Sequence, residues 1–148
     1  MSEFETHPMD DWLPHRGRMR LIDRVDRCDA EAIACTAVVR EDGLFTETNG
    51  LPAWIGIELM AQAAAAWAGA RARAGGGVPR VGFLVGARRY DAQVPFFAMG
   101  AALDIVAVCA AAGDNGMRLF DCTIAHEGRE LASGRISVFE AASEPGGD

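Results

Sequence analysis

The segment Pro52–Ala74, PAWIGIELMAQAAAAWAGARARA, decides the fold of this chain. It has no proline after its first residue, it is rich in Ala, Leu, Met and Gln, and three glycines, Gly75–Gly77, follow it. Helix-forming residues followed by such a stop predict one long helix. From Ala53 to Ala70 the only charged residue is Glu58, and a helix that is apolar on all sides is buried on all sides.

A segment this long and apolar also invites comparison with a membrane span. The residues around Glu58 are mostly small, however, and segments with strand-like patterns flank the helix. This arrangement favours the centre of a globular domain, so we expect no membrane association.

Strand-like segments lie on both sides of the predicted helix. Two precede it, Arg20–Asp26 and Ala32–Arg40, with the turn Cys28–Glu31 between them. Clusters of Gly, Pro, Asp and Asn, such as Val94–Gly100, separate the later segments, so the second half predicts an antiparallel meander. The four later segments are Val81–Tyr90, Ala102–Ala110, Leu119–His126 and Leu131–Glu140.

An antiparallel sheet that curls around a single central helix fits this order of two strands, one helix and four strands. That architecture is the hot-dog fold, an α+β fold whose helix is usually covered on its remaining side by a second subunit. We assign residues 11–140 to one hot-dog domain. Residues 1–10 and 141–148 are expected to be flexible ends because their composition is polar.

The composition excludes several classes of function. The chain has 148 residues, and its 14 basic and 21 acidic residues give a net charge of −7. Nucleic acids and anionic membrane surfaces require clustered positive charge, so we expect neither as a partner. The four cysteines, Cys28, Cys35, Cys109 and Cys122, form no CxxC pair and lie in or beside apolar stretches. We interpret them as core thiols of a cytoplasmic protein, and we expect no metal and no cofactor.

Glu58 is the first candidate catalytic residue. A carboxylate on an apolar helix loses hydration, which disfavours its charged form unless a cation or hydrogen-bond donors compensate. Such a group suits general acid–base chemistry. Gln62 lies one turn further on the same face, where it could orient Glu58 or bind a substrate carbonyl. The alternative is a structural carboxylate paired with Arg16 or Arg88.

The start of the helix is a second candidate. The amides of Ala53–Gly56 are expected to lack helical partners and to polarise a thioester carbonyl, in the manner of an oxyanion hole. An ordinary capped helix end is the alternative. Among the histidines, His7 and His126 are expected to be solvated. His15 either braces a loop or reaches the site.

These residues resemble the bacterial 3-hydroxyacyl-ACP dehydratases. Leu13–Val25 is similar to their LPHR…DRV opening, and Pro52–Gln62 to the central-helix motif PGxxxxExMAQ. Val81–Gly86 is similar to the strand that follows that helix. The likeness spans about residues 12 to 139, and it is closest to a divergent branch that accompanies aryl-polyene-type pathways.

The resemblance implies removal of water from a 3-hydroxyacyl thioester to give a trans-2-enoyl product. In the family a Glu and a His from opposite subunits form the catalytic dyad. Glu58 falls on the Glu position, and Ala53 on a Gly whose amide contacts the thioester carbonyl. We therefore predict Glu58 and His15 as catalytic residues. The predicted substrate-binding residues are Gln62, Ala53, Trp54 and Gly86.

No histidine falls on the family's His position. One alignment places Leu44 there and a shifted one places Leu51. Three explanations stay open. His15 takes the role, a related hot-dog subunit supplies the imidazole in a heterodimer, or the chain is a non-catalytic subunit. A hot-dog thioesterase, whose helix carboxylate activates water, is the competing enzyme.

The expected partners are an acyl carrier protein or acyl-CoA thioester and a second hot-dog subunit in a homodimer or heterodimer. Acyl-tunnel residues would come from Trp54, Met60, Trp67 and Phe83, although a role in the core or in a dimer interface is favoured for them. A docking patch for acidic carrier protein would come from Arg71, Arg73, Arg88 and Arg89.

Overall fold

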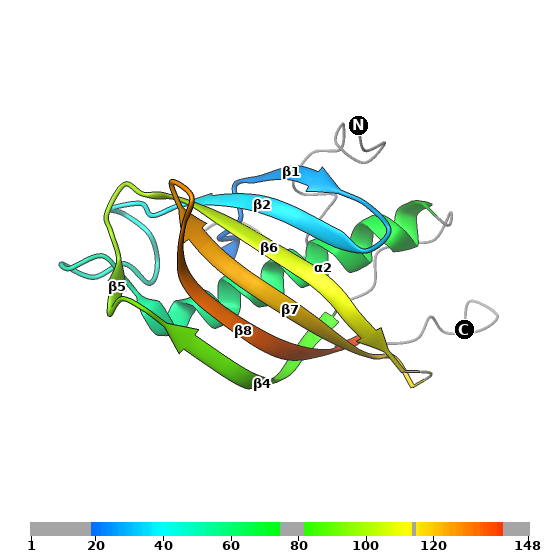
Figure 1. Cartoon of the computed structure of the whole chain (residues 1–148). Helices are drawn as coiled ribbons and strands as arrows, with labels where there is room; N and C mark the ends of the chain where they lie inside the picture. The colour runs from blue at the N-terminus through cyan, green and yellow to red at the C-terminus, as the bar shows by residue number, and fades with distance from the viewer. Residues whose placement is uncertain (1–18, 75–81, 114, 141–148) are drawn as a thin grey trace.

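The chain is described from a computed structural model, which covers residues 19–74, 82–113 and 115–140. Both expected flexible ends, together with His15 and Arg16, lie outside these described residues. Figure 1 shows the described part as one strongly curved sheet with one long helix lying across it.

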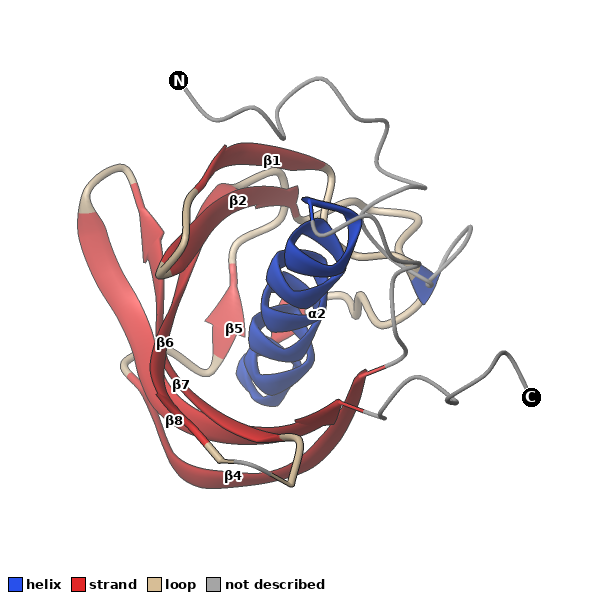
Figure 2. Ribbon diagram, turned by 90° about the vertical axis from the view of Figure 1, so that its right-hand side faces the viewer, coloured by secondary structure: helices blue, strands red, loops and turns tan. Residues whose placement is uncertain are grey.

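The six-stranded sheet is antiparallel throughout, in the order β1-β2-β6-β7-β8-β4. Its strands run from β1 at one edge to β4 at the other, and the sheet curls around α2 (Figure 2). The hot-dog architecture and the antiparallel meander of the second half are confirmed. The strands are β1 (Arg24–Cys28), β2 (Ala32–Val38), β4 (Gly82–Ala92), β6 (Ala102–Ala112), β7 (Met117–His126) and β8 (Arg129–Glu140).

The helix α2 (Gly56–Ala74) contacts β2, β4, β6, β7 and β8. Residues 62 to 70 of the helix are all buried, as the apolar sequence predicts. Their small alanine side chains allow the helix to lie close to the concave face of the sheet. Larger side chains fill the remaining space, notably Trp67 and Phe120, whose rings meet edge to face with centroids 5.6 Å apart. Among the described residues, no helix has the length and hydropathy needed to cross a membrane.

Two short strands were not predicted. β3 (Leu51–Pro52) pairs with β5 (Phe96–Phe97), inside the segment expected to be only a separator. Gly50 makes this pairing possible. Its φ is +120°, and a Cβ there would lie 2.3 Å from the carbonyl oxygen of Phe97. Only glycine combines that backbone conformation with so close an approach.

The first strand begins later than predicted, at Arg24 instead of Arg20. Asp23 already bonds to β2, but the backbone groups of Met19 and Leu21 bond to the side chain of Gln62 instead of to a strand. Residues 19 to 21 therefore lie beside α2 and outside the sheet. The sequence pattern alone does not identify Gln62 as the partner, because it lies 41 residues from Leu21 and 43 residues from Met19 in the sequence.

The helix also begins differently from the prediction. A 3-10 turn, η2 (Ala53–Ile55), precedes α2. The amide of Ala53 donates to the carbonyl of Pro95 at 3.0 Å, and the amide of Gly56 donates back into the turn. The expectation that all amides of Ala53–Gly56 lack partners is therefore wrong. The β3–β5 pairing brings Pro95 to the helix start and supplies the missing acceptor.

Candidate active site

Glu58 lies on a partly exposed stripe in the first half of α2. The partly or fully exposed residues of η2 and the first half of α2 are Trp54, Ile57, Glu58 and Ala61. Their spacing of three and four residues places them in a single stripe along the helix. Trp54 is the most open of them, at 66% exposure. The carboxylate therefore belongs to a narrow, partly exposed face.

Gln62 is fully buried directly beside this face, at 0% exposure. Its Nε2 donates to Oε2 of Glu58 at 3.0 Å and to the carbonyl of Met19 at 2.8 Å. Its Oε1 accepts a hydrogen bond from the amide of Leu21 at 2.8 Å. The predicted pairing of Gln62 with Glu58 is thus present in the structure. A role of Gln62 in binding the substrate carbonyl would require breaking one of these contacts.

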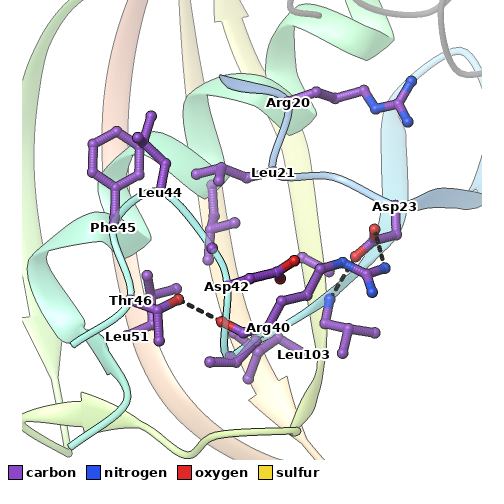
Figure 3. A pocket seen from close by; sticks show the side chains of 15 residues that line it. Arg20, Leu21, Asp23, Arg40, Asp42, Leu44, Phe45, Thr46, Leu51 and Leu103 are labelled. Carbon is purple, nitrogen blue, oxygen red and sulfur yellow. Dashed lines mark hydrogen bonds and ion pairs between the residues drawn. The ribbon is translucent and has the colours of Figure 1, made fainter. Parts of the chain in front are cut away.

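A pocket of about 420 Å³ lies next to this network (Figure 3). It reaches α2 at Leu59, the residue after Glu58, and it reaches the Gln62-bonded segment at Arg20 and Leu21. Apolar side chains, among them Leu51 and Leu103, form about half of its lining. The loop after β2 lines it with residues 39–40 and 42–46.

One side of the pocket is charged. The side chains of Arg20, Asp23, Arg40 and Asp42 gather there, opposite Leu44 and Phe45 (Figure 3). Asp23 accepts hydrogen bonds from the Arg40 guanidinium and from the amide of Val38, both at 2.7 Å. A pocket that combines apolar and polar groups suits a ligand with an apolar part and a polar part.

Both residues aligned with the family's histidine line this same pocket. Leu44 is 42% exposed at its rim, and Leu51 is buried in its wall. No histidine is present among the described residues that line the pocket. His126 ends β7, where Nδ1 lies 3.0 Å from the carbonyl oxygen of Ala102 and Nε2 lies 3.6 Å from a Glu127 carboxylate oxygen. Its partly buried position differs from the expected solvated turn.

The other predicted site residues lie apart from this pocket. Gly86 is at a β-bulge of the edge strand β4, and a Cβ there would meet open space. The substrate-binding roles of Gly86, Ala53 and Trp54 stay predictions. Met60 and Trp67 are core residues, with exposures of 0% and 2%, so neither is a free tunnel wall. The side chain of Phe83 lies outside the described residues.

The predicted structural partners of Glu58 are also placed only in part. Arg88 donates to the hydroxyl of Ser137 at 3.1 Å, and Arg16 lies outside the described residues. Of the predicted docking arginines, Arg71 stacks on Trp67 and Arg89 pairs with Asp91. The charged wall of the pocket was missed by sequence reasoning. A charged residue beside a strand looks the same whether it faces solvent or a pocket.

The chain matches a known protein family and several solved structures. The sequence pattern of the ApeP-like family, described as ApeP dehydratase, matches residues 7–145. The chain belongs to the ApeP-like dehydratase family. Among solved structures, the dehydratase heterocomplex ApeI:P from Xenorhabdus doucetiae contains a chain that is 30% identical, with a TM-score of 0.85 and 93% of each chain covered. The predicted resemblance to hot-dog dehydratases is confirmed.

More distant structures share the fold of this ApeP-like chain. AziG from S. sahachiroi is 18% identical, with a TM-score of 0.61 over 79% of this chain and 89% of its own. A hypothetical thioesterase with coenzyme A from Streptococcus pneumoniae TIGR4 is 12% identical, with a TM-score of 0.63 over 80% and 85%. Identities this low show the fold alone. No curated protein matches the sequence.

Proposed function

We propose that this chain is a subunit of a 3-hydroxyacyl-thioester dehydratase and that Glu58 is its acid–base residue. In the reaction a base removes a proton from C2, the C3–O bond breaks, and a trans double bond forms between C2 and C3. The Glu58 carboxyl group, when protonated, delivers its proton to the departing hydroxyl, which leaves as water. Family membership and the pocket beside α2 support this assignment.

The position of Glu58 carries the proposal. Its side chain lies on a partly exposed stripe of α2, whereas the described lining of the adjacent pocket holds Leu44 and Leu51 where the family has its histidine. We therefore propose that a related hot-dog subunit supplies the imidazole that removes the C2 proton. The similarity to a chain of the ApeI:P heterocomplex favours this pairing over a homodimer.

The acyl group enters the 420 Å³ pocket in this proposal, and its apolar part packs against Leu51, Leu59 and Leu103. The carrier is an acyl carrier protein, and the reaction is cytoplasmic. A homodimer in which His15 acts as the base is the second candidate. One observation favours it. His15 precedes Met19 by four residues in the sequence, and Gln62 bonds both to the carbonyl of Met19 and to Glu58.

The test follows hydration of an enoyl thioester by the loss of its conjugated absorbance. We would assay the purified chain alone, the chain mixed with the ApeI subunit of the Xenorhabdus heterocomplex, and ApeI alone. Glu58→Gln and His15→Ala would be compared in each setting. Glu58→Gln keeps the size of the side chain and removes its acidity, so we expect a loss on the order of 100-fold or more.

Activity that requires both subunits and is lost only in Glu58→Gln supports the heterodimer. Activity of the chain alone that His15→Ala abolishes favours the homodimer. Full activity of the Glu58→Gln mixture would show that this chain is a non-catalytic subunit. Release of free thiol from a saturated acyl thioester, measured in parallel, would indicate a thioesterase instead.

A further inference from the structure

We propose that Gln62 is a positioning residue that locks the Glu58 carboxylate to the wall of the acyl pocket. This inference rests on the proposed function, since it assigns the reaction's acid to Glu58. Glu58 and the pocket residues Arg20 and Leu21 belong to different segments of the chain, and Gln62 fixes the position of one relative to the other.

The carboxamide of Gln62 has its hydrogen-bonding groups occupied on two sides. One N–H points to Glu58, one to the carbonyl of Met19, and the carbonyl oxygen receives the amide of Leu21, all within 2.8 to 3.0 Å. Only one orientation of the carboxamide satisfies this set, because the opposite one would place two donors face to face at Leu21. The Gln62 side chain is completely buried, so solvent does not replace these partners of its carboxamide when the bonds break.

The carboxamide of Gln62 bonds to the backbone on both sides of Arg20. It accepts a hydrogen bond from the amide of Leu21 and donates one to the carbonyl of Met19, so a single side chain takes both backbone groups. The segment 19 to 21 is thereby fixed to α2 before it enters the sheet.

This segment is also part of the pocket. Arg20 and Leu21 both line it, and the next helix residue after Glu58, Leu59, lines it as well. Gln62 therefore joins the pocket wall and the carboxylate through one rigid group. Glutamine is required for this: glutamate at position 62 lacks the two donors, and methionine lacks all polar groups.

The experiment uses the full chain in the active assembly and compares Gln62→Met, Gln62→Glu and a matched control, Trp67→Phe. The control also removes a buried side-chain hydrogen bond to the backbone, from the Trp67 indole to the carbonyl of Asp29, but at the other end of α2. A displaced acid costs rate more than binding. We expect kcat of Gln62→Met to fall on the order of 10- to 100-fold while KM changes less than about threefold.

A second measurement does not depend on catalysis. The side-chain amide protons of Gln62 are followed by NMR in the wild type and in Glu58→Ala, and we expect one of the two resonances to move because it loses its carboxylate acceptor. Gln62→Glu should lower kcat at least as much as Gln62→Met, since it places a second carboxyl group against Glu58.

Either of two results would overturn the inference. One is a folded Gln62→Met assembly with wild-type kcat, or with no greater loss than Trp67→Phe. The other is an amide resonance that is unchanged in Glu58→Ala. If the wild-type assembly hydrates no enoyl thioester, the proposed function fails, and the catalytic part of this inference fails with it. The NMR result then separately decides whether Gln62 holds Glu58.

Discussion

The hydroxyl of Tyr90 donates a hydrogen bond of 2.5 Å to the carbonyl of Ala53, and so ties β4 to the turn that begins α2. Gly56 lies against this contact, because a Cβ on residue 56 would come within 2.1 Å of the Tyr90 hydroxyl oxygen. The edge strand and the helix start therefore meet at a position that admits no side chain. Glu58 follows Gly56 by two residues. The contact therefore also helps to fix the position of Glu58 relative to β4.

Replacing Gly56 with Ala should destabilise the protein by about 1–3 kcal/mol, because the new methyl group overpacks the Tyr90 contact. Tyr90→Phe alone should cost about 1 kcal/mol by removing the hydroxyl bond to Ala53. The double variant should be more stable than the sum of the two losses predicts, since the phenyl ring leaves room for the methyl group. Urea denaturation of the four proteins measures this coupling. Strict additivity would argue against the packing shown here.

If the pocket holds the acyl chain, a charge introduced at its rim should weaken substrate binding. Leu44→Asp should leave stability nearly unchanged, because the side chain is 42% exposed, but it should raise KM for a long enoyl thioester on the order of tenfold. Val108→Asp is the matched control: Val108 is 40% exposed, on β6, and is not among the described residues that line the pocket. Equal KM values for the two variants would place the acyl chain elsewhere.

The two tryptophans of the helix segment should behave in opposite ways. Trp67→Ala should cost about 3–5 kcal/mol, because the ring is buried, contacts Phe120, and lies under the guanidinium groups of Arg71 and Arg118. Trp54→Ala should leave the isolated chain about as stable as before.

In the proposed heterodimer, however, Trp54 lies on the stripe with Glu58, where a large aromatic residue suits an interface. We expect Trp54→Ala to weaken association with the partner subunit about tenfold or more, measured by analytical ultracentrifugation. Unaltered association would mean that this face of α2 does not form the interface.

We expect the buried cysteines to lower the free energy of unfolding at alkaline pH. Burial raises the pKa of the Cys28 and Cys122 thiols from 9.0 to about 12. Both thiols are therefore neutral in the folded chain at pH values where they ionise in the unfolded chain. The contribution of the neutral thiols to the free energy of unfolding is complete below pH 9 and is lost as the pH rises from there toward 12.

The urea midpoint should accordingly fall as the pH rises from about 9 to 10.5. The fall should be shallower in a Cys28→Ala/Cys122→Ala variant than in Cys109→Ala, which removes the partly exposed thiol. The same slope in both variants would show that other groups dominate the alkaline transition.

Much of the fold was predictable because its signals are local. The composition of Pro52–Ala74 identifies a buried helix, and the alternating segments on either side identify strands. The wrongly predicted segments are those in which a residue distant in sequence takes the backbone hydrogen-bonding groups. Gln62 takes the groups of Met19 and Leu21 from the expected first strand, and Pro95 takes the amide of Ala53. Hydrophobic periodicity carries no information about either partner.

The sequence by itself determined the hot-dog architecture, the dehydratase family and the isolated carboxylate Glu58, because composition, periodicity and motif are properties of short segments. The tertiary structure alone decided what surrounds that carboxylate. It placed Gln62 between Glu58 and the residues 19 to 21, and it formed a pocket from Leu21, Leu59 and Leu103. Residues so far apart in sequence meet only when the sheet curves around α2, and that curvature is a property of the whole packed domain.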